Sequence, residues 1–170
     1  GQRIHFLHQR GTGPAPLPLV LTHGWPGSFV EMEAILPLLA DPASHGGDAA
    51  DAFHVVVPSL PGYGFSPAPT AKGTGPFEIT GLWAQLMTAL GYDTFGAQGG
   101  GWGASISHWL AYRYSVWVKG LHLNFPPGSL RLLLGPEHRP LRAAEERFPH
   151  QLTACALVHG AHAPSMLPRP

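Results

Sequence analysis

The sequence has almost no cysteine, no excess of charge of either sign and no long hydrophobic run, and each absence excludes a class of protein. Ten basic residues balance ten acidic ones, so there is no basic face for nucleic acid and no polybasic segment for a membrane surface. The single cysteine, Cys155, excludes an internal disulfide framework. No apolar run approaches the roughly eighteen residues that a membrane span requires. We expect a cytoplasmic protein without nucleic-acid partners, and its oligomeric state stays open.

The composition is that of a folded domain. The chain has 170 residues, of which 44% are apolar, and this is enough for a hydrophobic core. It starts at Gly1 without a methionine and enters a strand-like run almost at once. We therefore expect a segment cut from a longer protein.

Strand-like and helix-like segments alternate along the chain. The strand-like runs are residues 3–8, 17–22, 54–58, 94–97 and 118–125. Helical spacing is found in three apolar sets: Phe29, Met32, Leu36 and Leu39; Ile79, Leu82, Trp83, Leu86 and Leu90; and Ile106, Trp109 and Leu110. Pro76 suits the first turn of the second helix. The alternation predicts an α/β fold with a doubly wound, mostly parallel sheet and sites beyond the carboxyl ends of its strands.

The segments between and after these elements have the composition of loops. Residues 41–52 and 59–75 are rich in glycine, proline or aspartate and predict surface loops. Residues 149–170 contain three histidines and four prolines without a clean period. We expect residues 1–148 to form a partial core and residues 149–170 to be an irregular tail, either out of frame or disordered.

A glycine-rich turn joins the fourth strand-like run to the third helix. Residues 98–104 read Gln-Gly-Gly-Gly-Trp-Gly-Ala. A strand that turns sharply into a helix can raise one side chain above a sheet when small residues flank it two positions before and after. Gly99 and Gly103 take those places, so Gly101 stands at the apex. This is the outline of a nucleophile elbow whose apex has no atom that can attack a substrate.

Two further motifs follow buried strands. Residues 23–28 read His-Gly-Trp-Pro-Gly-Ser, and such a turn can aim a backbone N–H into the space above the sheet as half of an oxyanion hole. Residues 58–66 read Pro-Ser-Leu-Pro-Gly-Tyr-Gly-Phe-Ser, an irregular loop that can shape a pocket wall. Taken alone, the first turn is equally compatible with a simple connection between elements, and for a loop like the second a simple connection is the more common outcome.

Taken together and in this order, the three motifs resemble the epoxide hydrolase branch of the α/β-hydrolase superfamily, particularly its microsomal, juvenile-hormone-type and bacterial members. The resemblance runs from about Arg3 to Phe148 and implies an incomplete α/β-hydrolase core without its lid. The family apex is aspartate, in Gly-Gly-Asp-Trp-Gly, where this chain has Gly101.

The resemblance also implies a mechanism without a cofactor. The apex carboxylate attacks an epoxide carbon and forms an ester, and lid tyrosines protonate the departing alkoxide. A histidine oriented by an acid then activates water, while backbone N–H groups hold the oxyanion. By match to the motifs, Trp25 and Trp102 supply these N–H groups. With Gly101 at the apex and no credible acid or histidine, we expect a catalytically impaired chain.

The same resemblance predicts a substrate pocket. It is lined by His23, Gly24 and Pro26 together with the indole rings of Trp25 and Trp102, and it suits a small apolar epoxide.

Other residues give little support for alternative chemistry. His5, His8 and His23 are expected to make structural hydrogen bonds, and the scattered histidines lack the spacing of a zinc site, so we expect no metal. His162 is superficially like the family's last catalytic residue, but no lid or strand precedes it. The serines nearest the motifs are Ser28, Ser66, Ser105 and Ser107, none of which stands at the apex.

Two other functions stay open. Residues 99–104 also satisfy the G-x-G-x-x-A pattern of dinucleotide binding. Against this, Trp102 would crowd a pyrophosphate, and no acidic residue ends the next strand. The second alternative is a non-catalytic remnant, or a module that keeps the pocket and binds small apolar ligands.

Overall fold

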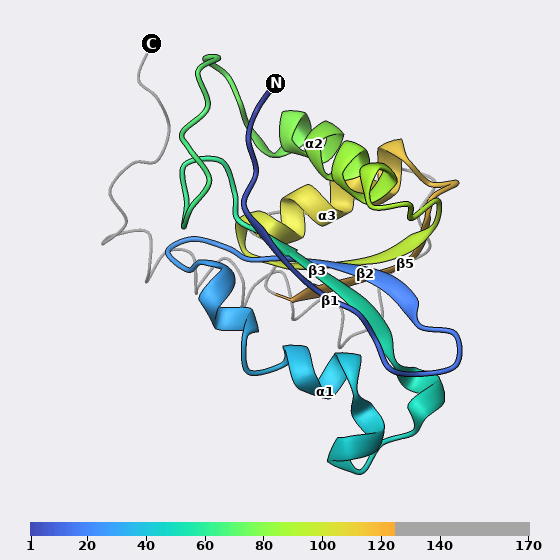
Figure 1. Cartoon of the computed structure of the whole chain (residues 1–170). Helices are drawn as coiled ribbons and strands as arrows, with labels where there is room; N and C mark the ends of the chain where they lie inside the picture. The colour runs from blue at the N-terminus through green and yellow to red at the C-terminus, as the bar shows by residue number, and fades with distance from the viewer. Residues whose placement is uncertain (125–170) are drawn as a thin grey trace, which may run out of the picture. The chain divides into compact units, whose positions relative to one another are not determined.

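Residues 1–124 are described by the computed structural model, and they form one five-stranded sheet between two layers of helices (Figure 1). The strands are β1 (Phe6–Gln9), β2 (Leu17–Thr22), β3 (Phe53–Pro58), β4 (Phe95–Gly100) and β5 (Val118–Asn124), in the spatial order β1-β3-β2-β4-β5. β1 pairs antiparallel with β3, and the other neighbours are parallel. The predicted α/β class with a doubly wound, mostly parallel sheet is confirmed.

The predicted strands are all present, with altered ends. β4 extends through Gly100, three residues beyond the predicted end, because its glycines pair with β2 and β5. Thr22 pairs with Gly99 and Asn124 with Gly100, so three strands end together at the predicted turn. Phe125, the last residue of the predicted fifth strand, lies outside the described residues.

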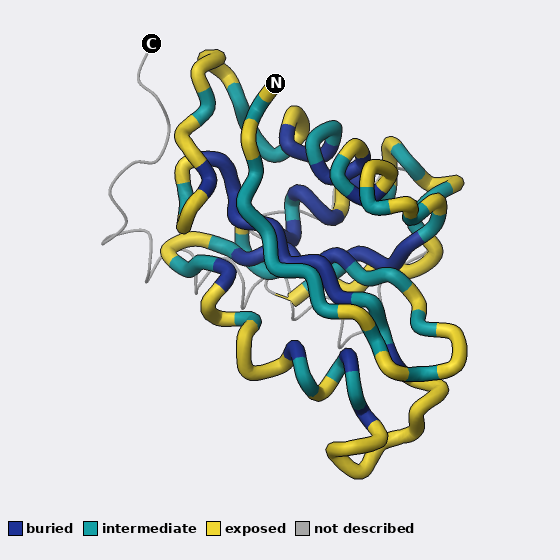
Figure 2. The backbone as a smooth tube through the Cα atoms, viewed as in Figure 1, coloured by how far each residue is buried: buried dark blue, intermediate teal, exposed yellow. Residues whose placement is uncertain are grey.

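Two long helices cover one face of the sheet. They are α2 (Pro76–Ala89), which begins at the predicted proline, and α3 (Trp102–Arg113), which starts four residues before Ile106, the first residue of its apolar pattern. Between them and the strands lies a core of fully buried side chains that includes Trp83, Met87, Phe95, Ile106 and Leu110. Figure 2 shows this burial in dark blue along the central strands and the inner sides of both helices.

The opposite face carries only short helical turns, where one helix was predicted. The apolar set from Phe29 to Leu39 is divided between η1 (Phe29–Met32) and α1 (Leu36–Ala40). Pro37 explains the break, because proline has no N–H for the Glu33 carbonyl and its ring clashes with that carbonyl in a continuous helix. The helix therefore restarts with Pro37 in its first turn, and the single-helix prediction was wrong.

The predicted surface loops hold little regular structure. Residues 41–52 contain two further short turns, η2 (Pro42–His45) and η3 (Ala49–Asp51), and residues 59–75 contain no helix or strand. The predicted tail, residues 149–170, lies outside the described residues, as does His162. None of the described helices is both long and apolar enough to span a membrane.

Candidate active site

Gly101 is the single residue between β4 and α3, and its backbone makes a sharp turn. Its φ of 56° and ψ of −120° lie in a region that L side chains rarely adopt. Such a strained strand-to-helix turn is what a nucleophile elbow requires. We use "elbow" for residues 99–103 and "apex" for position 101.

The glycines on either side of the apex allow the backbones to come together. A Cβ placed on Gly99 would lie 2.1 Å from the carbonyl oxygen of Gly103, and one on Gly103 would lie 2.0 Å from the carbonyl oxygen of Thr22. Both distances are far inside van der Waals contact, and neither oxygen can rotate away because it belongs to the backbone. The small residues predicted for these positions are therefore required by the close approach of β2, β4 and α3.

The apex itself has room for a side chain. A Cβ built on Gly101 would have ordinary contacts, 3.6 Å to the Cα of Gly24 and 3.9 Å to the backbone nitrogen of Trp25. Trp102 opens α3 directly after the apex, where the first N–H groups of a helix have no intrahelical partner. Side-chain atoms at position 101 would thus begin beside the Trp25 amide and the N-terminus of α3.

Residues 23–28, which we call the Trp25 loop, are packed tightly against the elbow. A Cβ on Gly24 would lie 2.7 Å from the carbonyl oxygen of Gly100. The Gly24 N–H donates to Oε1 of Glu31 at 3.2 Å, and Ser28 caps η1 by accepting from the Val30 N–H at 3.4 Å. These contacts hold the loop where its Trp25 amide borders the apex.

His23, at the start of the Trp25 loop, is fully buried. Its Nδ1 lies 3.0 Å from the Gly24 carbonyl oxygen, and its Nε2 accepts a hydrogen bond from the Leu60 N–H at 3.1 Å. Burial lowers the pKa of His23 below its usual value, and the Gly24 hydrogen bond and the Glu31 carboxylate partly offset this effect. His23 thus ties the Trp25 loop to residues 58–66.

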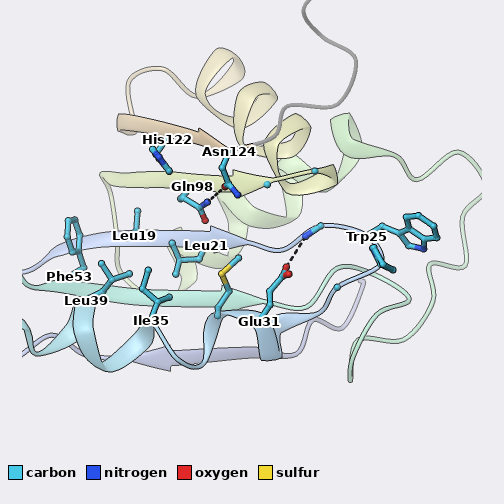
Figure 3. A pocket seen from close by; sticks show the side chains of 16 residues that line it. Leu19, Leu21, Trp25, Glu31, Ile35, Leu39, Phe53, Gln98, His122 and Asn124 are labelled. Atoms are coloured by element: carbon cyan, nitrogen blue, oxygen red, sulfur yellow. Dashed lines mark hydrogen bonds between the residues drawn. The ribbon is translucent and has the colours of Figure 1, made fainter. Parts of the chain in front are cut away.

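A pocket of about 660 Å³ extends from the elbow along the α1 face of the sheet (Figure 3). Most of its lining is apolar, and besides Trp25 and Pro26 the apolar side chains are Leu19, Leu21, Met32, Ile35, Leu39 and Phe53. Of the predicted site residues, Gly24, Trp25, Pro26 and Gly101 line this pocket, whereas the buried His23 does not, nor does Trp102.

The polar lining of the pocket was not anticipated from the sequence. It consists of Glu31, Gln98, His122 and Asn124. Gln98 donates to the side-chain oxygen of Asn124 at 2.5 Å, and Figure 3 shows this pair facing the apolar wall while the Trp25 indole lies at the far end. The register of β4 and β5, which pairs Gln98 with His122 and Gly100 with Asn124, brings these side chains to one place. No local sequence pattern could have indicated that these polar side chains meet in one pocket.

The remaining candidates have structural contacts. Nδ1 of His5 lies 2.9 Å from Ser59 Oγ, and Nε2 of His8 lies 2.8 Å from the Tyr92 hydroxyl, as expected of hydrogen-bonding histidines. Within residues 1–124, no three or more His, Cys, Asp or Glu side chains are grouped to hold a metal ion. The serines named above are at the η1 cap, in the 58–66 loop and inside α3, so none of them stands at the apex position.

Comparison with known families gives two matches. The family model described as "alpha/beta hydrolase fold" matches residues 18–151, and the one described as "Epoxide hydrolase N terminus" matches residues 1–32. The first of these covers most of the chain, including the Trp25 loop and the elbow.

Individual proteins agree with these matches. A protein of Stigmatella aurantiaca described as "Putative epoxide hydrolase" is 51% identical over 152 residues, covering 87% of this chain and 34% of that protein. "Epoxide hydrolase 1" of Oryctolagus cuniculus is 46% identical over 144 residues, covering 79% and 32%. The structure of Aspergillus niger epoxide hydrolase is 33% identical with a TM-score of 0.66, covering 94% of this chain and 42% of that one. The chain thus spans about a third of the length of these curated relatives.

Proposed function

Since the chain belongs to the alpha/beta hydrolase fold family, in its epoxide hydrolase branch, we propose that residues 1–148 are the N-terminal part of an epoxide-hydrolase core. In this proposal the apex is the nucleophile position, and the amides of Trp25 and Trp102 form the oxyanion hole. The single observation that carries it is the glycine turn at position 101, with space for a side chain beside the Trp25 nitrogen.

The reaction assigned to this site is the opening of an apolar epoxide. A carboxylate oxygen at the apex attacks a ring carbon, the carbon–oxygen bond of the ring breaks, and the alkoxide takes up a proton. Water then hydrolyses the ester to a vicinal diol and restores the carboxylate. The amides of Trp25 and Trp102 face the negative charge of the carboxylate and of the tetrahedral intermediate.

This chain cannot take the first step, because Gly101 has no side chain to form the ester. Binding and oxyanion stabilisation alone leave only a residual part of an enzyme's acceleration when a nucleophile is removed. We therefore infer that the chain as it stands has little or no epoxide-opening activity.

The substitution Gly101→Asp tests this proposal. After incubation with styrene oxide, we expect a covalent adduct of one substrate per chain, located by mass spectrometry on the peptide that contains position 101, or the diol if the ester turns over. Gly101→Asn, which has the same shape without the charge, is the matched control and gives neither product. A folded Gly101→Asp protein that yields no adduct and no diol contradicts the role of the apex.

A second candidate function, binding of small apolar ligands without catalysis, is favoured by the pocket of about 660 Å³. Its apolar wall and few polar groups are typical of small-molecule sites. Calorimetric titration of the unaltered chain with styrene oxide and with its diol tests this function. Binding without formation of product supports a ligand-binding module. A chain that does not fold supports a non-catalytic remnant of an enzyme.

A further inference from the structure

One peptide unit of the Trp25 loop faces both the apex and a buried histidine. The peptide between Gly24 and Trp25 is trans, so its C=O and N–H point in opposite directions. The N–H side, at the Trp25 nitrogen, is 3.9 Å from the Cβ position of residue 101. The C=O side lies 3.0 Å from Nδ1 of His23. Whatever holds this carbonyl therefore also sets the direction of the N–H.

The hydrogen bonds of His23 determine which ring nitrogen carries the proton. The Leu60 N–H can only donate, so Nε2, at 3.1 Å from it, must be unprotonated. In a neutral imidazole the proton is then on Nδ1, which donates to the Gly24 carbonyl oxygen. The ring is fully buried, and Tyr63 packs edge-on against it at 5.5 Å between ring centres, so it has little freedom to flip.

Glu31 holds the preceding peptide unit of the same loop. Its Oε1 accepts from the Gly24 N–H at 3.2 Å, so Gly24 is hydrogen-bonded to a side chain on each of its two peptide groups. The glycine also has no room to move toward β4, where the Gly100 carbonyl lies 2.7 Å from its Cβ position. Among the described residues, none accepts a hydrogen bond from the Trp25 N–H.

We propose that His23 is a positioning residue for the oxyanion hole: its Nδ1–H holds the Gly24 carbonyl and thereby turns the Trp25 N–H toward the apex. The ring does not touch the reacting atoms, and it acts through the Gly24–Trp25 peptide. This inference rests on the proposed function, which gives the Trp25 amide its role.

A simpler role for His23 would be to tether two loops through Leu60, and two substitutions separate these roles. The amide nitrogen of His23→Asn occupies the place of Nδ1 and keeps the donor to Gly24 while losing the acceptor for Leu60. The amide oxygen of His23→Gln occupies the place of Nε2 and keeps the acceptor for Leu60 while losing the donor to Gly24. A positioning role predicts that only the asparagine preserves the direction of the Trp25 N–H.

The direction of that N–H can be measured without a substrate. The measurement uses proteins that also carry Gly101→Asp. If the Trp25 N–H donates to the introduced carboxylate, it lowers the pKa of that carboxyl group. An NMR titration of the carboxyl group measures this pKa. With His23→Asn we expect the pKa to stay unchanged, and with His23→Gln we expect it to rise by about one unit. Equal shifts in both variants, no shift in either, or a rise with asparagine alone overturns the proposal.

A second measurement needs no substitution. Heteronuclear NMR of the imidazole nitrogens in the unaltered chain should show His23 protonated at Nδ1 and unprotonated at Nε2 at neutral pH. The opposite tautomer or a cationic ring overturns the proposal even if the variants fail to fold. Neither measurement involves an epoxide, so a failure here is distinguishable from a failure of the proposed function, which is read from the adduct.

Discussion

The two faces of the sheet differ in how completely they are filled, although residues of the same strands alternate between them. On the side of α2 and α3, side chains such as Trp83 and Ile106 are fully buried. On the side of α1, residues 1–124 supply only a five-residue helix and short turns, and the pocket lies along β2, β4 and β5. Helix length explains the contrast, because fourteen- and twelve-residue helices cover the strands that a helix restarted at Pro37 cannot.

Truncating one large side chain on the filled face should have the largest effect. Trp83→Ala removes a buried indole whose Nε1 donates to Thr22 Oγ1 at 3.0 Å, and it should cost about 3–5 kcal/mol of unfolding free energy. Ile35→Ala at the pocket, where Ile35 is 42% exposed, should cost less than about 1 kcal/mol. Urea denaturation of both variants measures the difference, and equal losses would mean that the faces are packed alike.

The next effect concerns two helical glycines on the filled face. Gly103→Ala should destabilise the fold by about 1–3 kcal/mol or more, because its Cβ meets the Thr22 carbonyl at 2.0 Å. Gly81→Ala, in α2, has only the Tyr114 hydroxyl at 3.9 Å and should stabilise by roughly 0.5–1 kcal/mol. Thermal denaturation compares the two variants. A stabilised Gly103→Ala protein would contradict the claim that the close approach of the Thr22 carbonyl requires glycine at position 103.

A smaller effect is a loss of stability in mild acid. Burial lowers the pKa of His23 in the folded protein below the unfolded value of about 6.5, and it does the same for His8. The unfolded chain therefore binds more protons, so the stabilisation is complete above about pH 6.5 and is lost as the pH falls through the folded pKa.

Substitution separates the two histidines. The charged group facing His23 is Glu31, and the Tyr63 ring packs against it. His23→Gln and His8→Gln should each flatten the fall in denaturation midpoint between neutral pH and about pH 5. An unchanged pH dependence in His23→Gln would mean that His23 is not kept neutral by burial.

The smallest expected effect is at Ser107, also on the filled face. Its Oγ is buried and has no hydrogen-bond partner among the described residues, and it lies 2.7 Å from the Cβ position of Gly99. Ser107→Ala removes an unsatisfied polar atom and should be neutral or stabilising by up to about 1 kcal/mol. A clear loss of stability on chemical denaturation would reveal a partner for this hydroxyl.

Prediction from sequence succeeded where the evidence was local. The continuous apolar runs of β2 and β3, the start of α2 at Pro76 and the glycine turn at position 101 all follow from neighbouring residues. It was wrong at the first helix because the apolar spacing from Phe29 to Leu39 was given more weight than Pro37. It also missed Glu31, Gln98 and Asn124 in the pocket, since their meeting depends on the pairing of distant segments.

By itself, the sequence determined the alternation of strands and helices and the glycines of the elbow, because backbone conformation and steric size are properties of single residues and their neighbours. Only the tertiary structure decided which groups surround the His23 ring and the Trp25 amide. The Leu60 N–H that bonds to Nε2 of His23 and the elbow that borders the Trp25 amide both belong to other parts of the chain. A hydrogen bond between distant segments exists only once the sheet has brought them together.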